Sequence, residues 1–391
     1  MRIVDVCAFY TPRGGGVKTY VERKLRAGPA AGHEIVVLAP GERHEVRHFG
    51  RGASVVTIPA PTFPLDRAYR YFDDEAALHD ALDRLDPDMV EAASPWTSAT
   101  MVARWRGRAP RALVMHADPL AAYAYRWFGA IARRETIDRR FDWYWRHLRA
   151  LDKRFDLIVC ASRDLARRLT DGGLARVVTE PMGVEPGTFS PALRDEALRA
   201  ELLAHCDLPP SALLLVGVGR FAPEKRWPKI VAAATRAGFH QPIGLMLIGD
   251  GRERDRIART AGGNPHVRLV QPVRDRGQLA AILASADALV HGCEAETFCM
   301  VAAEARASGL PLIVPDAGGA SDQFVPGRGT LYRAADGRAL AAAIAGFIDD
   351  DPAAHRARAA ADAAATRTMD SHFADLFARY AALRERAVDV A

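Results

Sequence analysis

The stretch that decides the fold runs from His291 to Gly319 and reads HGCEAETFCMVAAEARASGLPLIVPDAGG. It follows the apolar run Ala288 to Val290, and it contains a second apolar run from Leu312 to Val314. This pattern predicts a strand, a loop, a helix and then another buried strand. Two carboxylates, Glu296 in the loop and Glu304 in the expected helix, stand eight positions apart.

The expected helix begins near Cys299, so its free amides and the positive end of its dipole face the loop that carries Glu296. Such a helix terminus favours an anion, and a phosphate is the natural candidate. Glu304 lies one to two turns into the helix, where its carboxylate would reach neutral hydroxyls of the molecule that carries the phosphate.

The stretch resembles the Glu-x7-Glu signature of glycosyltransferase family 4, whose members have the GT-B fold. Two spaced acids by themselves more often mean a loop acid and a solvated helix residue. Here the resemblance extends to an aromatic residue, an alanine, a proline and three glycines around the acids. The matching positions are Glu296, Phe298, Glu304, Ala305, Gly309, Pro311, Gly318 and Gly319.

A second glycine-containing loop follows the strand-like run Leu213 to Val216. Its sequence, GVGRFAPEK from Gly217 to Lys225, formally satisfies the Gly-x-Gly-x-x-Ala pattern of dinucleotide-binding folds. Pro223 and the late position of the first candidate acid, Asp250, count against that interpretation. The loop instead resembles the family's Gly-x-Gly-Arg-x-x-x-x-Lys segment, which implies that Arg220 and Lys225 grip the diphosphate of a sugar nucleotide.

Near the start of the chain, glycines separate a predicted strand, Ile3 to Ala8, from a predicted helix, Val17 to Leu25. A glycine loop lets backbone amides approach an anion closely, although a plain tight turn has the same composition. The resemblance assigns Gly15 and Gly16 to the family's Gly-Gly loop, which faces the donor phosphate and the acceptor.

His116 follows the predicted strand Ala112 to Met115. Ligands of open parallel sheets bind beyond the carboxyl ends of the strands, so this histidine is placed to face a ligand. The family often has His-Asp at this point, whereas here Ala117 separates His116 from Asp118. The alternative is a histidine that merely caps a strand.

Strand-like and helical segments alternate along all 391 residues, which predicts an α/β protein with parallel sheets. The remaining predicted strands are 34–38, 55–58, 88–91, 157–160, 244–248 and 267–270. A turn-rich linker from Pro181 to Pro191 suggests two domains. We expect the GT-B arrangement, two Rossmann-like domains facing a cleft: an acceptor-binding domain of residues 1–186 joined by a C-terminal helix at 370–391, and a nucleotide-sugar-binding domain of residues 187–369.

The resemblance also implies residue roles. Glu296 orients the donor sugar, Glu304 the ribose, and His116 the sugar from the other domain; Lys225 and Arg220 stabilise the leaving diphosphate. Three departures affect the local backbone: His291-Gly292 replaces a usual Pro-Ser, Cys299 a usual Gly, and Pro272 removes a donor beside the expected base. The further expected donor contacts are Gly219, Gly249, Val273, Phe298, Cys299, Met300 and Val301.

The implied reaction is retaining transfer of a hexose, such as mannose or glucose, from a UDP- or GDP-linked sugar to a lipid, glycan or small-molecule acceptor. No separate cofactor is expected. Because the cleft segments contain no Asp-x-Asp, metal independence is expected as well. A sugar-nucleotide epimerase, a catalytically silent binding partner and a nicotinamide dehydrogenase remain alternatives.

The overall composition agrees with a cytoplasmic enzyme. Five cysteines without a Cys-x-x-Cys pair favour a reduced compartment, and we expect packed thiols rather than ligands or nucleophiles. The start of the sequence lacks a signal-peptide pattern and no apolar run reaches membrane-spanning length, so we expect neither a signal peptide nor a transmembrane segment. The net charge of +5 does not by itself indicate nucleic acid, and no nucleic-acid partner is expected.

Residues 121–154 differ from the rest of the chain, because aromatic residues alternate with arginines there. Such a segment suits peripheral binding to an anionic membrane, here the inner face of the plasma membrane. It equally suits an exposed helix with buried aromatic rings. Stacking on nucleic acid is a third interpretation, but no recognisable nucleic-acid module accompanies it.

Overall fold

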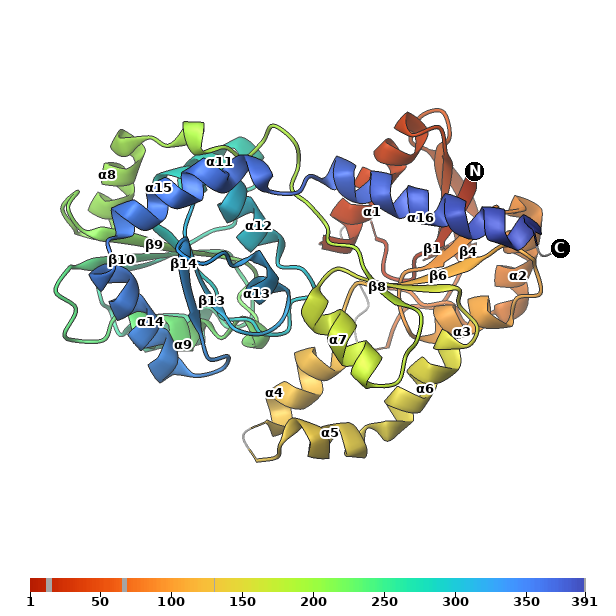
Figure 1. The fold of residues 1–391 in the computed structure, drawn as a ribbon, viewed down its shortest axis with the longest axis horizontal. Helices are drawn as coiled ribbons and strands as arrows, with labels where there is room; N and C mark the ends of the chain where they lie inside the picture. Colours follow the sequence, from red (N-terminus) through yellow and green to blue (C-terminus); the bar gives the residue numbers. More distant parts are fainter. Residues whose placement is uncertain (12–15, 65–68, 130, 390–391) are drawn as a thin grey trace. The chain divides into compact units, whose positions relative to one another are not determined.

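The structure is a computed structural model that describes residues 1–11, 16–64, 69–129 and 131–389. The chain divides into two compact units (Figure 1). Unit 1 comprises Met1–Pro181 and Met369–Ala391, and unit 2 comprises Met182–Thr368. The sequence predicts a division at 186–187, and the division between Pro181 and Met182 lies in the same turn-rich linker.

Unit 1 is built around a sheet with strand order β3-β4-β2-β1-β5-β6-β7-β8. Neighbouring strands are parallel except for β3, which pairs antiparallel with β4 at the edge. Its elements up to the linker are β1 (Arg2–Val6), α1 (Gly16–Ala30), β2 (Glu34–Gly41), β3 (Glu45–His48), β4 (Ala53–Pro59), α2 (Glu75–Leu85), β5 (Met89–Ala92), α3 (Thr97–Arg104), β6 (Arg111–Met115), a π-helical turn (Leu120–Ala124), α4 (Tyr125–Phe128), α5 (Arg134–Arg140), α6 (Asp142–Asp152), β7 (Leu157–Cys160), α7 (Arg163–Asp171) and β8 (Val177–Thr179).

The last helix, α16 (Met369–Asp389), returns to unit 1, as the sequence predicted. Its Phe373 ring packs against α1, 5.2 Å from the Tyr20 ring, and stacks on Phe377 of the same helix at 5.7 Å. Arg379 also pairs with the buried Glu180 at 2.8 Å. These contacts fix the C-terminal helix on the first domain.

A fully buried lysine lies at the centre of unit 1. The Nζ atom of Lys24, in α1, lies 2.8 Å from Asp5 of β1 and 2.5 Å from Glu91 of β5, and all three side chains are 0 % exposed. The hydroxyl of Tyr380 in α16 donates to the other oxygen of Glu91 at 2.7 Å. Burial raises the pKa of Asp5 to about 6, while Lys24 holds the pKa of Glu91 below its usual value against the effect of burial. This network joins two central strands to both helices.

Unit 2 has an all-parallel sheet with strand order β11-β10-β9-β12-β13-β14. Its elements are a 3₁₀ turn (Pro191–Leu193), α8 (Glu196–His205), β9 (Leu213–Val218), a 3₁₀ turn (Pro223–Lys225), α9 (Trp227–Ala234), β10 (Ile243–Ile248), α10 (Arg254–Ala261), β11 (Val267–Val270), α11 (Arg276–Ser285), β12 (Ala288–Val290), α12 (Met300–Ala307), β13 (Leu312–Pro315), α13 (Gly319–Gln323), β14 (Gly329–Tyr332), α14 (Gly337–Asp349), α15 (Pro352–Asp362) and a 3₁₀ turn (Ala363–Ala365).

The predicted strands are present with small shifts at their ends, and three short edge-region strands were missed. β3 is exposed, β8 is half-buried throughout, and β14 carries two residues that are not buried. A strand without a continuous apolar run gives no clear sequence signal, because its stability comes from pairing with a neighbour.

We predict that Lys24→Met strongly destabilises unit 1. Removing one partner of a buried ion group leaves uncompensated charge on Asp5 and Glu91 and costs about 3–5 kcal/mol. With a typical urea dependence, the midpoint of urea unfolding followed by circular dichroism should fall by roughly 1 M or more. Lys18→Met is the matched control, since Lys18 pairs with Glu22 on the same helix and both side chains are partly exposed. Equal midpoints for the two variants would contradict this account.

Candidate functional site

The candidate site of unit 2 lies where the strand order reverses. β9 pairs with β10 on one side and with β12 on the other, and Val216 of β9 lies opposite Leu289 of β12. The loops that leave these two strands therefore begin side by side, at the position where open α/β sheets bind ligands. They are the glycine loop 219–226 and the acidic loop 291–299.

An ion pair joins the two loops. Lys225 of the glycine loop contacts Glu296 of the acidic loop, and both side chains are largely buried. Burial opposes both charges, but each charge stabilises the other, so the pKa of Glu296 lies well below its usual value and that of Lys225 well above. A largely buried cation and a largely buried anion therefore lie together at this edge of the sheet.

A second ion pair, which the sequence analysis missed, lies beside the first. Arg226 adopts a left-handed backbone conformation with φ 54° and binds both carboxylate oxygens of Glu294. A side chain at Gly292 would collide with the Lys225 carbonyl, since its Cβ would lie only 2.5 Å away. Glycine at this position therefore allows the loops to approach closely.

The Gly318-Gly319 turn supports the acidic loop from behind. The Gly319 amide donates to the Glu296 carbonyl at 2.6 Å. A Cβ at Gly319 would lie 2.5 Å from the backbone of Phe298, and one at Gly318 would lie 2.4 Å from the Glu294 carbonyl. These glycines are needed for close packing of one backbone on another.

Helix α12 begins at Met300, next to Glu296, as the sequence predicted. Its N-cap residue Cys299 has φ 69°, in the left-handed region that favours glycine, which explains why glycine suits this position. The first intrahelical hydrogen bonds come from Ala302 and Ala303, so the amides of Met300 and Val301 occupy the helix positions that precede them.

Buried side chains surround Glu296. His291 is 1 % exposed, and its Nε2 atom lies 3.3 Å from Glu296 Oε1. Burial lowers the pKa of His291, which keeps the ring neutral, and burial raises the pKa of the Cys293 and Cys299 thiols. Phe298 is buried at the turn of the loop. Among the described residues, His291, Glu296 and Cys299 are also grouped closely enough to hold a metal ion.

Glu304 lies further along α12 and has its own partner. Its carboxylate accepts a hydrogen bond of 2.5 Å from Arg276, and burial raises the pKa of Glu304. Asp275 caps α11 through the amides of Gly277 and Gln278, which places Arg276 at the first helical position. The Arg276 guanidinium also lies over the Phe189 ring at 5.0 Å. No sequence motif indicated Arg276.

The other predicted donor residues have different surroundings. Arg220 is 76 % exposed and pairs with Glu224 at 3.1 Å, away from the buried Lys225–Glu296 pair. Gly219 and Gly249 lie against each other, since a Cβ on Gly249 would be 2.0 Å from the Gly219 carbonyl. Val273 lies half-buried in the loop between β11 and α11.

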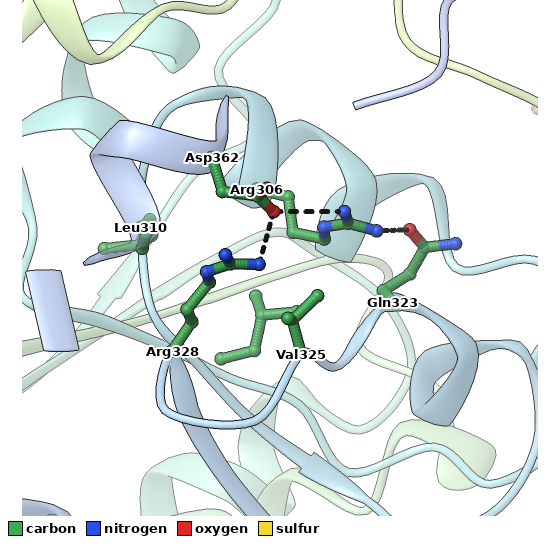
Figure 2. Close-up of a pocket in the computed structure, with 8 residues that line it drawn as sticks. Arg306, Leu310, Gln323, Val325, Arg328 and Asp362 are labelled. Carbon is green, nitrogen blue, oxygen red and sulfur yellow. Dashed lines mark hydrogen bonds and ion pairs between the residues drawn. The ribbon is translucent and has the colours of Figure 1, made fainter. Parts of the chain in front are cut away.

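The hollow shown in Figure 2 lies at the other end of α12 and α13. Asp362 binds Arg328 at 2.6 Å and Arg306 at 3.7 Å, and Gln323 accepts from Arg306 at 3.4 Å (Figure 2). Gln323 in turn donates to the Phe298 carbonyl at 3.4 Å. None of the predicted site residues lines this hollow, and its polar network braces α12 and the acidic loop.

In unit 1, His116 directly follows β6. Its ring packs edge-on against the Tyr20 ring with centroids 4.8 Å apart, and Tyr20 contacts His372 of α16 through its hydroxyl at 3.0 Å. Burial lowers the pKa of His116 to about 4, so its imidazole is neutral near pH 7. The Asp118 carboxylate forms an ion pair with Arg168 and accepts a hydrogen bond from the Ala121 amide in the Leu120–Ala124 turn.

Of the two predicted glycines of unit 1, the structure describes Gly16 but not Gly15. Gly16 is the first residue of α1, and a Cβ built on it would have no tertiary contact within 4 Å among the described residues. Gly15 lies outside the described residues.

Comparisons with known proteins agree with this architecture. The family model described as "Glycosyltransferase Family 4" matches residues 14–187, and the one described as "Glycosyl transferases group 1" matches residues 206–364. A GDP-mannose-dependent alpha-mannosyltransferase of Mycolicibacterium smegmatis is 31 % identical over 89 % of this chain and 89 % of its own length. The chain belongs to glycosyltransferase family 4.

Two further similarities extend over nearly the whole family 4 chain. A GDP-mannose-dependent alpha-(1-6)-phosphatidylinositol dimannoside mannosyltransferase of Mycobacterium tuberculosis is 29 % identical over 98 % of this chain and 97 % of its own. The structure of sucrose-phosphate synthase from Thermosynechococcus elongatus matches with a TM-score of 0.76 at 19 % identity, covering 98 % of both chains. The fold is therefore GT-B, and the protein is a glycosyltransferase that transfers a hexose from a nucleotide sugar.

The pKa of His116 gives a prediction about stability. Its folded pKa of about 4 lies below the unfolded value of about 6.5, so the unfolded chain binds more protons between these values. The stability that the neutral ring contributes is complete above pH 6.5 and is lost as the pH falls towards 4. Between pH 7.5 and pH 5 the free energy of unfolding should fall by about 1–2 kcal/mol more in the wild type than in His116→Gln.

The measurement is urea unfolding of the wild type and variants at both pH values. His48→Gln is the control, because His48 is exposed on the edge strand β3. That variant should keep the wild-type pH dependence. If His116→Gln also keeps it, the neutral-ring assignment is wrong.

Proposed function

We propose that the protein is a retaining, metal-independent mannosyltransferase that uses GDP-mannose and modifies a membrane glycolipid. The observation that carries the catalytic part is the buried Lys225–Glu296 pair beside the first amides of α12. The donor identity is supported by the relatives from M. tuberculosis and M. smegmatis, which are named GDP-mannose-dependent enzymes.

In the proposed mechanism, positively charged groups and helix amides stabilise the diphosphate as it leaves the sugar. Lys225 and the amides of Met300 and Val301 would bind phosphate oxygens that gain negative charge while the glycosidic bond breaks. Arg220, which is exposed, would turn from Glu224 to the same diphosphate. These fixed charges would supply the stabilisation that a metal ion provides in other enzymes.

The two glutamates would hold neutral parts of the donor. A phosphate that draws Lys225 away leaves Glu296 free to accept hydrogen bonds from sugar hydroxyls. Glu304 would exchange Arg276 for the ribose hydroxyls in the same way. His116, neutral at pH 7, would contact the sugar from unit 1, and Gly15 and Gly16 would contribute backbone amides.

Retention would follow from attack on the same face of the sugar that the diphosphate leaves. In that scheme the acceptor hydroxyl forms the new bond to the anomeric carbon while the bond to the diphosphate oxygen breaks. The departing diphosphate takes the acceptor proton, so no protein side chain has to act as nucleophile. The role of the protein is then to position both substrates and to stabilise the leaving group.

The acceptor proposal rests on exposed side chains of unit 1. Helices α4, α5 and α6 extend from its sheet (Figure 1). Aromatic and aliphatic residues are exposed there, with Trp127 at 57 % and Ile131 at 84 %. Tyr144 and Trp145 are buried instead, so the segment divides between core and surface. We call the exposed aromatic, aliphatic and arginine side chains of this segment the patch. Its other members are Tyr123, Phe128, Trp143, Arg133, Arg134, Arg139 and Arg140.

This patch suits the interface of an anionic membrane, where aromatic rings enter the headgroup region and arginines meet lipid phosphates. Within the part of the chain that is described, no helix combines the length and apolarity needed to cross a bilayer. Binding through the patch would bring the enzyme to a lipid-linked acceptor.

The reaction is tested with labelled GDP-mannose and UDP-glucose, phosphatidylinositol mannoside vesicles and EDTA. We expect label from GDP-mannose in the lipid fraction, an α-linked product by NMR and rates unaffected by the chelator. A strict and reversible need for Mg²⁺ or Mn²⁺ would contradict metal independence. Release of an epimerised free nucleotide sugar would instead indicate an epimerase.

In this assay, Lys225→Ala and Arg220→Ala should each reduce turnover about 100-fold or more. The expected loss corresponds to about 3 kcal/mol of stabilisation of the developing anion. Lys229→Ala is the control, because Lys229 is exposed on the next helix and binds the Ala335 carbonyl. Near-normal turnover in both test variants would refute the phosphate assignment, and a loss in Lys225→Ala alone would remove Arg220 from it.

Membrane binding is tested by sedimentation with anionic and neutral vesicles. Each cation near an anionic surface contributes about 1 kcal/mol, so Arg133, Arg134, Arg139 and Arg140 changed together to Ser should abolish pelleting with anionic vesicles at low salt. The matched control changes four exposed arginines of unit 2 to Ser and should still pellet: Arg236, Arg252, Arg259 and Arg338. Equal, negligible pelleting of the wild type with both vesicles would end the membrane proposal and leave the transferase proposal intact.

A further inference from the structure

The acidic loop brings together three side chains that can bind a metal ion. His291, Glu296 and Cys299 each offer one ligand atom, and these atoms all lie within 4.8 Å of one another. His291 is 1 % exposed and Cys299 is 3 % exposed. The buried Nε2 atom of His291 lies 3.3 Å from Glu296 Oε1 and has no well-formed hydrogen bond to any of the described residues. A buried polar atom of this kind normally has a partner, so its orientation towards the carboxylate points to a ligand.

The donor set is that of a borderline-soft divalent ion. Imidazole nitrogen, cysteine sulfur and carboxylate oxygen are the usual zinc ligands, at about 2.0–2.3 Å from the ion. Tetrahedral geometry at those lengths places ligand atoms roughly 3.3–3.8 Å apart, so the group would contract by about 1 Å. We expect the side chains to make this adjustment, because the Gly318-Gly319 turn holds the backbone of the loop.

Two of the three proposed ligands, His291 and Cys299, differ from the family pattern that this loop resembles. His291 and Cys299 stand where the family pattern that this loop resembles usually has a proline and a glycine. Cys299 also keeps a left-handed backbone at φ 69°, which is unfavourable for a residue with a side chain. The thiol is therefore held in this position at some cost in backbone energy.

We propose that His291, Glu296 and Cys299 bind a zinc-type ion that inhibits the transferase reaction. On binding, the Cys299 thiol releases its proton to solvent, and His291 coordinates through the Nε2 lone pair. The thiolate and the Glu296 carboxylate together balance the two charges of the ion, and Lys225 loses its partner. Water or the neighbouring Cys293 completes the coordination.

Inhibition follows because the ion and the donor compete for the same carboxylate. A Glu296 that is bound to the ion no longer accepts hydrogen bonds from the donor sugar. This consequence depends on the proposed function of Glu296, whereas the metal site itself does not. The site is thus distinct from a catalytic metal: it would lower the rate, and a chelator would restore it.

Metal binding is tested on the full-length chain with Co²⁺, whose thiolate complexes absorb in the near ultraviolet. We expect one Co²⁺ per chain with a thiolate charge-transfer band, displaced by Zn²⁺. Cys299→Gly, which suits the positive φ, and His291→Asn should each weaken binding about 100-fold or more, beyond the roughly 10–100-fold cost of changing an outer-shell partner. The matched control is Cys206→Ser, because Cys206 is buried elsewhere in unit 2.

An absent band in the wild type, or an unchanged affinity in both Cys299→Gly and His291→Asn, would overturn the site. Thermal unfolding of each variant distinguishes lost ligation from lost folding. These readouts need no activity, so they stand if the transferase proposal fails. Zn²⁺ should inhibit wild-type turnover reversibly and should inhibit Cys299→Gly much less, relative to its own uninhibited rate. A wild type that binds Co²⁺ but is not inhibited by Zn²⁺ would overturn the regulatory role.

Discussion

The candidate site of unit 2 depends on two ion pairs between neighbouring loops. Lys225 binds Glu296 and Arg226 binds Glu294, and each cation belongs to the loop after β9 while each acid belongs to the loop after β12. The sheet allows these contacts, because β9 and β12 are adjacent at the point where strand order reverses. Removing charges from water is costly, so each pair requires its partner in place. The ion pairs thereby fix the path of both loops and the start of α12.

The sequence predicted most of the fold because most of its strands are buried on both faces. β7, β9 and β10 are continuous apolar runs, which periodicity detects without knowledge of neighbours. β3, β8 and β14 lack that signal, since partly exposed strands are stabilised by pairing. The Lys24 network was also beyond sequence reasoning. Its members are separated by many residues and meet only when α1 covers β1 and β5.

The candidate site was predicted unevenly for a similar reason. Motif spacing named Lys225 and Glu296, and the structure places them in contact. It assigned no site role to Arg226, Arg276 or His291, because the acids beside them become neighbours only through tertiary packing. Motif spacing also grouped Arg220 with Lys225, although Arg220 extends into solvent and pairs with Glu224.

The Lys225–Glu296 pair also affects the free energy of binding an anion at this site. Lys225 is already taken from water by Glu296, so a phosphate that binds it does not bear the whole cost of that desolvation. When the phosphate replaces Glu296 as the partner of Lys225, Glu296 loses its cationic partner. Glu296 then lies beside the neutral His291 and the start of α12. A ligand that supplies both a phosphate and hydroxyl donors compensates each partner of the pair. A sugar phosphate ester carries its hydroxyl donors at a distance from the phosphate, so it can reach both partners of the pair at this edge of the sheet.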